Sequence, residues 1–223
     1  MNLSLLWLPA ALCLLDWLAV YRDWKGIQWI TKPGVVLGIL IWIGPGSRSL
    51  LTPFNWFTLG ILCSLLGDVI LLLPHDRFIA RLFAFLGAHL AYIIGLNLDP
   101  LPFNFSTLML FAVVLAVSWR LSRRFATEIR KKQPANLLPP FAIYFIVLSI
   151  FLFSALATLA KDTWQPWPSL LVTAGALLFF ISDVVLAWHR FLMPIPQRDI
   201  KVRIPYHLAQ LALIAGASLH FLA

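Results

Sequence analysis

Charged residues are scarce in this sequence. Asp, Glu, Lys and Arg make up 12% of its 223 residues, whereas 61% are hydrophobic and the mean hydropathy is +0.88. A soluble domain has about 25% charged residues. One soluble core of this size cannot bury so much apolar surface. The composition therefore excludes an ordinary soluble protein and predicts that the chain is surrounded by lipid.

Cysteine is also scarce, and the sequence lacks the motifs of several enzyme classes. The two cysteines, Cys13 and Cys63, lie inside apolar runs and have neither zinc-site spacing nor the pattern of a disulfide framework. The sequence contains no G-x-S-x-G motif, no H-E-x-x-H motif and no phosphate-binding glycine loop. We therefore expect no metal and no cofactor.

Long polar segments are also missing, so we expect a single domain over residues 1–223. Apolar runs are separated by turns such as Pro45-Gly46 and Pro74. The first run lacks a basic segment and a cleavage pattern, so we expect a retained helix and not a signal peptide. We predict an all-α, polytopic membrane bundle with eight transmembrane helices, at about residues 3–20, 33–45, 55–73, 78–97, 103–120, 137–160, 168–188 and 205–222.

The basic residues fall mostly on one set of predicted loops. Of 17 Lys and Arg residues, 15 fall on the odd-numbered loops, and only Arg48 and Lys161 on the even ones. This asymmetry predicts a multi-pass plasma or bacterial inner membrane protein with odd loops in the cytoplasm and both termini on the other side. It also explains the net charge of +8 without nucleic acid as a partner. We interpret the basic run Arg120–Lys132 as a solvated orientation signal that touches anionic lipid.

Two pairs of predicted helices have similar segments. Residues 67–71 (GDVIL) resemble 182–186 (SDVVL), and 89–91 (HLA) match 207–209 (HLA). These elements are four spans apart, so they would have the same orientation in the membrane. Two readings stay open: a parallel four-plus-four pseudo-repeat, or chance similarity among Leu, Ala and Val.

Small residues recur at helical spacing on the third and fourth predicted helices. They are Gly60, Ser64 and Asp68 on one, and Gly87, Ala91 and Gly95 on the other. Such stripes let two helices approach closely. We therefore expect these two helices to pack along them.

Ionisable residues occur inside the predicted spans, where a charge is costly and usually functional. By our helix ends, Asp68 and Asp183 lie at the same depth in the cytoplasmic half, and we predict that their carboxyl groups face each other. The others lie on the same side or near the middle, so we expect one polar cavity opening towards the cytoplasm. For each residue a structural role, such as a salt bridge or an interhelical hydrogen bond, is the alternative. The full set is Asp16, Lys32, Asp68, His89, Asp183 and His207, with Tyr92, Tyr206 and Gln210 as polar neighbours.

Two chemistries fit paired carboxylates with His and Tyr helpers. One is metal-free hydrolysis by acid–base catalysis. The other is a proton-coupled carrier of a small molecule or lipid, in which the aspartates relay protons. A phosphate at the cytoplasmic interface could be held by Lys32 or Arg190.

The order of several short motifs resembles that of the YhhN family, whose animal members are lysoplasmalogenases. The resemblance covers nearly the whole chain, with Tyr206-His207 standing where the family pattern has paired tyrosines. The motifs are Thr31-Lys32-Pro33, Ser64-x-x-Gly67-Asp68-Val69, Phe85-x-x-Ala88-His89-x-x-Tyr92, Ser182-Asp183-x-x-Leu186-Ala187 with Arg190-Phe191, and Tyr206-x-x-x-Gln210.

The resemblance implies a membrane enzyme that cleaves the vinyl ether bond of a lysoplasmalogen. The products would be a fatty aldehyde and a glycerophospho head group, and the partners would be a lysophospholipid substrate and membrane lipids. The family's two essential aspartates map onto Asp68 and Asp183, which become the expected catalytic residues. The expected substrate-binding or supporting residues are Lys32, Ser64, His89, Tyr92, Ser182, Arg190, Tyr206 and Gln210.

Overall fold

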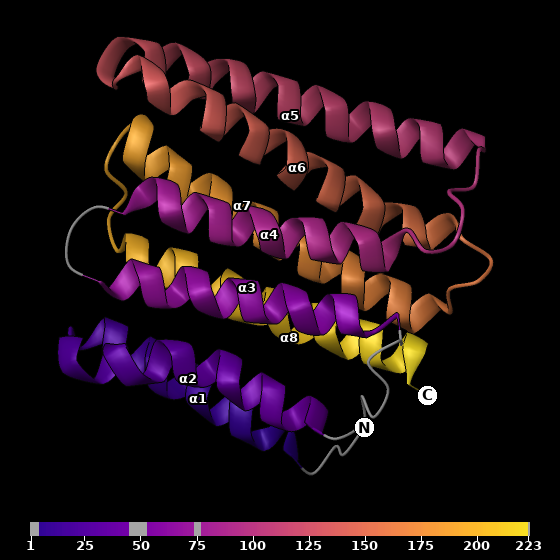
Figure 1. Ribbon diagram of the computed structural model, residues 1–223, viewed down its shortest axis with the longest axis horizontal. Coiled ribbons are helices and arrows are strands. Elements are labelled where there is room, and N and C mark those ends of the chain that lie inside the picture. Colours follow the sequence, from indigo (N-terminus) through magenta and orange to yellow (C-terminus); the bar gives the residue numbers. More distant parts are fainter. Residues whose placement is uncertain (1–4, 45–52, 74–76, 223) are drawn as a thin grey trace.

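The chain forms an all-helical bundle (Figure 1). The computed structural model describes residues 5–44, 53–73 and 77–222, and those residues contain helices and no strand. The predicted turns at Pro45-Gly46 and Pro74, and Arg48, lie outside this part of the chain. Within it there are eight α-helices: α1 (Trp7–Tyr21), α2 (Lys25–Ile43), α3 (Asn55–Leu72), α4 (Phe78–Leu96), α5 (Phe105–Lys132), α6 (Leu138–Ala157), α7 (Pro166–Phe191) and α8 (Arg198–Phe221), with 3₁₀ turns at Ala135–Leu137 and Thr158–Ala160.

The helices have the length and exterior of membrane spans. In the described residues five are long and apolar enough to cross a bilayer, namely α2, α4, α5, α6 with its flanking 3₁₀ turns, and α7, while α1 and α3 are shorter apolar helices. Large apolar side chains such as Ile30, Phe83 and Val113 are exposed on the outside of the bundle, as lipid-facing residues are. The chain is therefore an integral membrane protein. A crossing by all eight helices stays a prediction.

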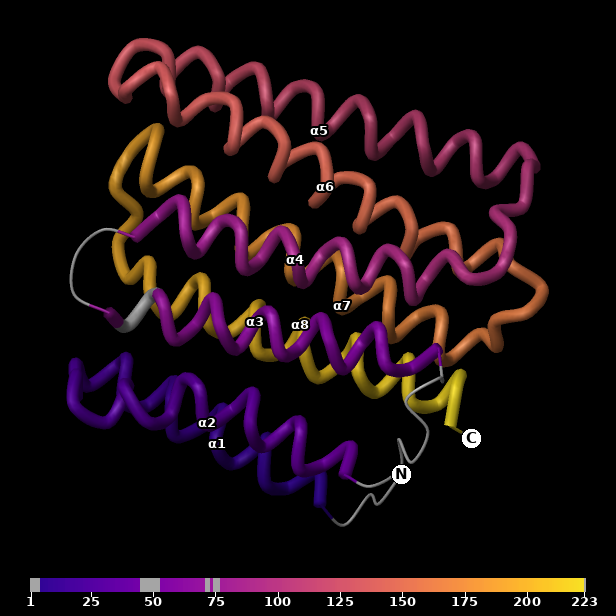
Figure 2. The backbone as a smooth tube through the Cα atoms, viewed as in Figure 1, coloured from indigo at the N-terminus to yellow at the C-terminus, as the bar shows by residue number. Residues whose placement is uncertain are grey.

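Sequence neighbours pair as helical hairpins (Figure 2). The α1–α2 pair lies on one side of the bundle and the α5–α6 pair on the other, with α3, α4, α7 and α8 between them. The α1–α2, α5–α6 and α7–α8 connections lie at one end, and the α4–α5 and α6–α7 connections lie at the opposite end. We call the first the basic end because Arg22, Lys25, Lys132 and Arg198 lie at its connections. Both α3–α4 and α7–α8, the elements of the proposed pseudo-repeat, are closely packed pairs. A repeat relationship between them stays a prediction.

Two predicted helix starts were wrong because each was placed at a proline. The predicted helices 33–45 and 205–222 begin earlier, at Lys25 and Arg198, so Pro33 and Pro205 lie inside α2 and α8. Proline in a helix interior removes one backbone hydrogen bond. Neighbouring helices and side chains compensate for this loss in membrane helices. The longer helices place Lys32, predicted at the edge of a loop, and Arg203, predicted within a loop, in the bundle interior, where both are buried.

The predicted end of the fifth helix, at residue 120, was also wrong. Helix α5 continues through the basic run to Lys132, starting from a capping box formed by Asn104 and Thr107. Lys and Arg are good helix formers, so a run of positive charge does not end a helix. Glu128 adds an ion pair to Lys132 one turn later, with a nitrogen–oxygen distance of 2.8 Å.

Glycine permits the close packing of α3 on α4, as the small-residue stripes predicted. A Cβ atom added at Gly60 would overlap the Tyr92 ring, and one added at Gly95 would lie 2.6 Å from the ring of Phe57. Aromatic side chains thus fill the space that the missing Cβ atoms leave. This packing places α3 and α4 so that their polar residues, Asp68 and His89, both reach the interior.

Candidate active site

A buried ion pair joins α2, α3 and α8. Lys32 Nζ lies 2.9 Å from Asp68 Oδ1, and the Tyr206 hydroxyl donates a hydrogen bond of 2.7 Å to Asp68 Oδ2. All three side chains are buried. A charge in such a site is stable only when it is paired and its remaining hydrogen bonds are satisfied. Lys32 and Asp68 pair with each other, and Tyr206 supplies a further hydrogen bond to the carboxylate.

The second carboxylate, Asp183, has different neighbours, on α4 and α6. The Tyr144 hydroxyl donates a hydrogen bond of 2.5 Å to Asp183 Oδ2. His89 Nε2 lies 3.8 Å from the same oxygen, a distance too long for a direct hydrogen bond. The Asp183 side chain is 12% exposed, compared with 1% for Asp68, so Asp183 is the more accessible of the two.

Asp183 lines a small cavity between α4, α6 and α7. The cavity has a volume of about 30 Å³, and its lining includes Arg81, Phe85 and Tyr144. A single water needs about 10–15 Å³ of such volume. The space beside the Asp183 carboxylate therefore has room for about two water molecules.

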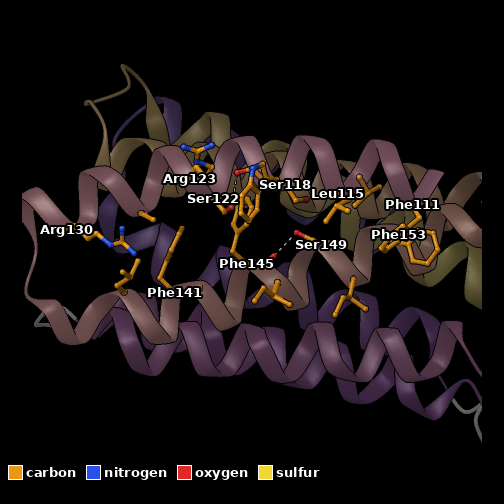
Figure 3. Close-up of a pocket in the computed structure, with 17 residues that line it drawn as sticks. Phe111, Leu115, Ser118, Ser122, Arg123, Arg130, Phe141, Phe145, Ser149 and Phe153 are labelled. Carbon is orange, nitrogen blue, oxygen red and sulfur yellow. Dashed lines mark hydrogen bonds between the residues drawn. The ribbon is translucent and has the colours of Figure 1, made fainter. Parts of the chain in front are cut away.

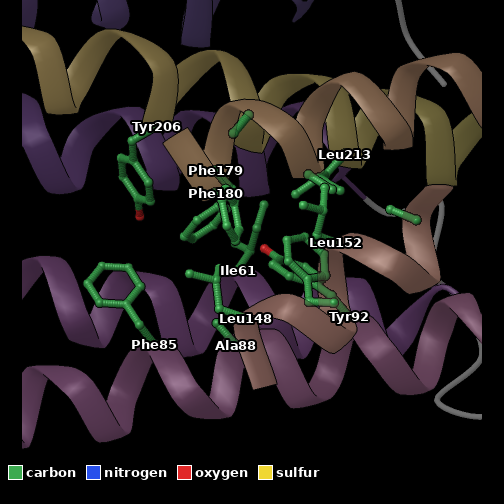
Figure 4. Close-up of a cluster of buried hydrophobic side chains, with 14 of the residues drawn as sticks. Ile61, Phe85, Ala88, Tyr92, Leu148, Leu152, Phe179, Phe180, Tyr206 and Leu213 are labelled. Carbon is green, nitrogen blue, oxygen red and sulfur yellow. The ribbon is translucent and has the colours of Figure 1, made fainter. Parts of the chain in front are cut away.

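Rings of buried side chains lie between the two carboxylate clusters, and Figure 4 shows two of them, Tyr206 and Phe179. The Tyr206 ring is edge-on to Phe179, with ring centres 5.4 Å apart, and Phe179 lies 4.7 Å from the His89 ring. Contacts thus run from Asp68 through Tyr206, Phe179 and His89 to Asp183. Direct juxtaposition of the two carboxyl groups stays a prediction.

The depth argument changes with the observed helix ends. Asp68 lies four residues before the end of α3 at Leu72, and Asp183 lies eight residues before the end of α7 at Phe191. At 1.5 Å per residue these positions are about 6 and about 12 Å from their helix ends. The predicted depths were equal because the third helix was ended at residue 73 and the seventh at residue 188, whereas α3 ends one residue earlier and α7 three residues later.

The remaining predicted residues lie around these clusters. The Tyr92 hydroxyl donates a hydrogen bond of 2.7 Å to Gln210 Oε1, one turn of α8 beyond Tyr206. The Ser182 hydroxyl donates to the Val202 carbonyl and so ties α7 to α8. Ser64 is buried in α3, one turn before Asp68, and Arg190 lies at the basic end of α7, with its guanidinium 4.1 Å from the centre of the Phe78 ring.

Two site residues were not predicted from the sequence. Tyr144 is the single tyrosine of a strongly apolar segment, and a buried tyrosine hydroxyl needs a partner, so this signal could have found it. Arg203 was counted as a loop charge. Its Nη1 lies 2.9 Å from Asp16 Oδ1, and Thr31 donates to the same oxygen. Asp16 is thereby part of a buried ion pair that holds α1, α2 and α8 together.

His207 lies on the turn of α8 that carries Tyr206, and its partner is another protein side chain. Its Nδ1 accepts a hydrogen bond of 3.1 Å from Trp17 Nε1. Among residues 5–44, 53–73 and 77–222, no three His, Cys, Asp or Glu side chains are grouped as a metal site requires. His207 therefore connects α8 to α1 in this structure.

Comparison with known proteins gives one family and several named relatives. The model of the YhhN family matches residues 27–217. Lysoplasmalogenase TMEM86B of Homo sapiens is 31% identical over 157 residues, which are 70% of this chain and 61% of that protein. The mouse (Mus musculus) protein of the same name is 28% identical over 213 residues, covering 94% of this chain and 83% of its own.

A bacterial relative matches at similar identity. The uncharacterized membrane protein YhhN of Escherichia coli O157:H7 is 30% identical over 197 residues, or 81% of this chain and 84% of its own. No solved structure matches the chain. The matched part of this chain spans about three fifths of the human relative's length.

Proposed function

The chain belongs to the YhhN family, and from that premise we propose that it is an intramembrane hydrolase of lysoplasmalogens. It would cleave the vinyl ether bond to give a fatty aldehyde and a glycerophospho alcohol. The observation that carries the proposal is Asp183, a hydrogen-bonded carboxyl group on a cavity with room for water inside an apolar bundle. Relatives about 30% identical to this chain are named lysoplasmalogenase, which supports the same reaction.

The cavity has a basic rim suited to the substrate's phosphate. Arg81 lines the cavity, and the guanidinium groups of Arg81 and Arg190 lie over the same Phe78 ring, at 5.3 and 4.1 Å from its centre. Guanidinium groups bind phosphate through charge-assisted hydrogen bonds. Lys32, the other expected phosphate partner, is engaged with Asp68 in the interior. We assign the head group to Arg81 and Arg190 because they lie near the ends of α4 and α7 at the basic end of the bundle, three residues after Phe78 and one before Phe191.

The reaction steps follow from the chemistry of a vinyl ether. Asp183, as general acid, donates its proton to the vinyl carbon that is β to the ether oxygen, and the double bond becomes an oxocarbenium ion. Water from the cavity adds to the carbon bonded to oxygen and returns a proton to the Asp183 carboxylate. The hemiacetal then breaks into the aldehyde and the alcohol. One water is consumed, and the carboxyl group is regenerated.

Asp68 is the second carboxylate of the proposed mechanism. It lies beyond Tyr206, Phe179 and His89 as seen from Asp183, so an alkyl chain has to part these rings before both carboxylates flank it. In that arrangement the Asp68 carboxylate would face the oxocarbenium ion and help to stabilise its positive charge, with part of the carboxylate charge already offset by Lys32. Lys32 and Tyr206 are positioning residues that hold Asp68.

The test is aldehyde release from a lysoplasmalogen by purified protein in detergent. No ion gradient exists there, so a carrier would release nothing. Asp183→Asn should lower turnover by roughly a thousandfold, since an amide cannot donate the proton. The matched control is Asp199→Asn, which changes an exposed aspartate paired with Arg198 and should keep full activity.

Asp68→Asn needs a partner variant because it leaves Lys32 as an unpaired buried cation. Removing one member of a buried pair costs about 3–5 kcal/mol. The double variant Lys32→Met/Asp68→Asn removes both charges, so its loss of turnover with a retained fold would support a role for Asp68 in the chemistry. Activity of every active form should survive EDTA. The proposal fails if wild-type protein releases no aldehyde, if Asp183→Asn stays active, or if EDTA abolishes activity and zinc restores it.

A further inference from the structure

A long apolar groove runs between α5 and α6, away from the carboxylates (Figure 3). Its volume is about 450 Å³, and on α5 its lining extends from Phe111 to Arg130. These residues are 19 apart, so the groove follows about 28 Å of helix at 1.5 Å per residue. Its length is close to the hydrocarbon thickness of a bilayer, about 30 Å.

The two ends of the groove differ in chemistry. Phe111 and Phe153 line the end away from the basic end of the bundle, and Arg123 and Arg130, two turns apart on one face of α5, line the other. Between them Ser118 is 7% exposed, and its hydroxyl has no hydrogen-bond partner among the described residues. A buried hydroxyl in this position is suited to a ligand that supplies an acceptor oxygen.

The charge around the basic half of the groove is strongly positive. Between Arg120 and Lys132, α5 carries six basic residues and one acidic residue, Glu128. Glu128 is held by Lys131 and Lys132, outside the groove. An occupant with a negative head and an apolar tail therefore matches both halves.

We infer that this groove binds one anionic phospholipid of the surrounding membrane. Its acyl chain would lie along the apolar half towards Phe111 and Phe153, an ester oxygen would accept from Ser118, and its head-group phosphate would contact Arg123 and Arg130. The groove and the proposed substrate cavity share one wall residue, Phe141 of α6, and are otherwise lined by different residues. Tyr144 contacts Asp183 in the cavity, whereas the next residue, Phe145, lines the groove.

The test is native mass spectrometry of delipidated protein in a mild detergent. Phosphatidylglycerol and phosphatidylcholine with the same acyl chains are the probes, and each bound lipid adds its mass to the protein. Wild-type protein should retain one phosphatidylglycerol in preference to phosphatidylcholine. Arg123→Gln/Arg130→Gln should weaken retention by roughly tenfold or more, given the usual contribution of each basic residue to anionic lipid binding.

Two further variants make the result specific to the groove. Arg120→Gln/Lys131→Gln removes the same charge from residues of α5 that do not line it and should keep the adduct. Ala142→Trp fills the groove from α6 without changing charge and should abolish the adduct. All the substituted residues are exposed, so each variant should melt at the wild-type temperature, which shows that its fold is intact. The inference would be overturned if all variants retained the lipid equally or if wild-type protein retained both lipids equally. It would also be overturned by a protein dimer in place of the lipid adduct, or by displacement of phosphatidylglycerol by a lysoplasmalogen.

Discussion

The two aspartates differ in what holds them. The Asp68 carboxylate is buried in an ion pair, with Lys32 Nζ 2.9 Å from its Oδ1. The Asp183 carboxyl group accepts a hydrogen bond of 2.5 Å from the Tyr144 hydroxyl and has a cavity beside it. The same residue type thus has two environments. In enzymes that use two carboxylates, such a difference in environment separates the acid from the second carboxylate.

Tyr144→Phe tests whether the hydroxyl on Asp183 matters for turnover. The ring keeps its packing, and one hydrogen bond to the carboxyl group is lost, so the carboxyl group is free to rotate away from the reacting carbon. We expect kcat to fall by about 10- to 100-fold with little change in KM, as for a group that acts mainly in the transition state. Steady-state kinetics of aldehyde release measure this. Tyr21→Phe, at an exposed tyrosine, is the control, and a rise in KM alone would contradict the prediction.

At the scale of single residues much of the site is visible in the sequence. Ionisable residues in apolar segments are rare and costly, so Lys32, Asp68, His89 and Asp183 stand out from the sequence alone. Their partners could not be assigned, because spacing along one helix does not say which helix lies opposite. Lys32 pairs with Asp68, 36 residues away, and Tyr144 donates a hydrogen bond to Asp183, 39 residues away.

At the scale of helices, apolar runs and their number were predictable, and several ends were not. Proline was read as a boundary at residues 33 and 205, and the helices continue through both. Tertiary packing in the interior overrides the local penalty that proline imposes. Charge was read as a loop signal at Arg120–Lys132, and the segment is helical because Lys and Arg favour helix.

Gly60→Ala tests the close approach of α3 and α4. The added methyl group would overlap the Tyr92 ring, which is buried and cannot move freely. Overpacking of this kind costs about 1–3 kcal/mol, so the melting temperature in detergent should fall by several degrees. Gly26→Ala is the matched control, because no atom lies within 4 Å of its added Cβ. Equal melting temperatures of the two variants would show that the α3–α4 packing adapts without cost.

At the scale of the whole molecule, the connections between described residues lie at alternating ends of the bundle, the arrangement that the predicted eight crossings would give. The α1–α2, α5–α6 and α7–α8 connections share the basic end, and α1 begins and α8 ends at the other. We predict that the basic end is cytoplasmic and that both termini are outside. Reporters inserted near Lys131 and fused after residue 223 should show opposite sidedness. A cytoplasmic C-terminus would reverse the map and move the proposed head-group site to the other leaflet.

The size of the Asp183 cavity governs which nucleophile the proposed cation meets. In free solution, vinyl ether hydrolysis in a water–methanol mixture yields acetal as well as aldehyde, because either solvent captures the oxocarbenium ion. A space of about 30 Å³ holds about two water molecules, whereas one methanol, with its extra methyl group, would occupy all of it. The protein should therefore release almost only aldehyde in a water–methanol mixture, whereas an acid catalyst in solution gives both products. The acetal-to-aldehyde ratio, measured by mass spectrometry, would show whether the space beside Asp183 excludes methanol.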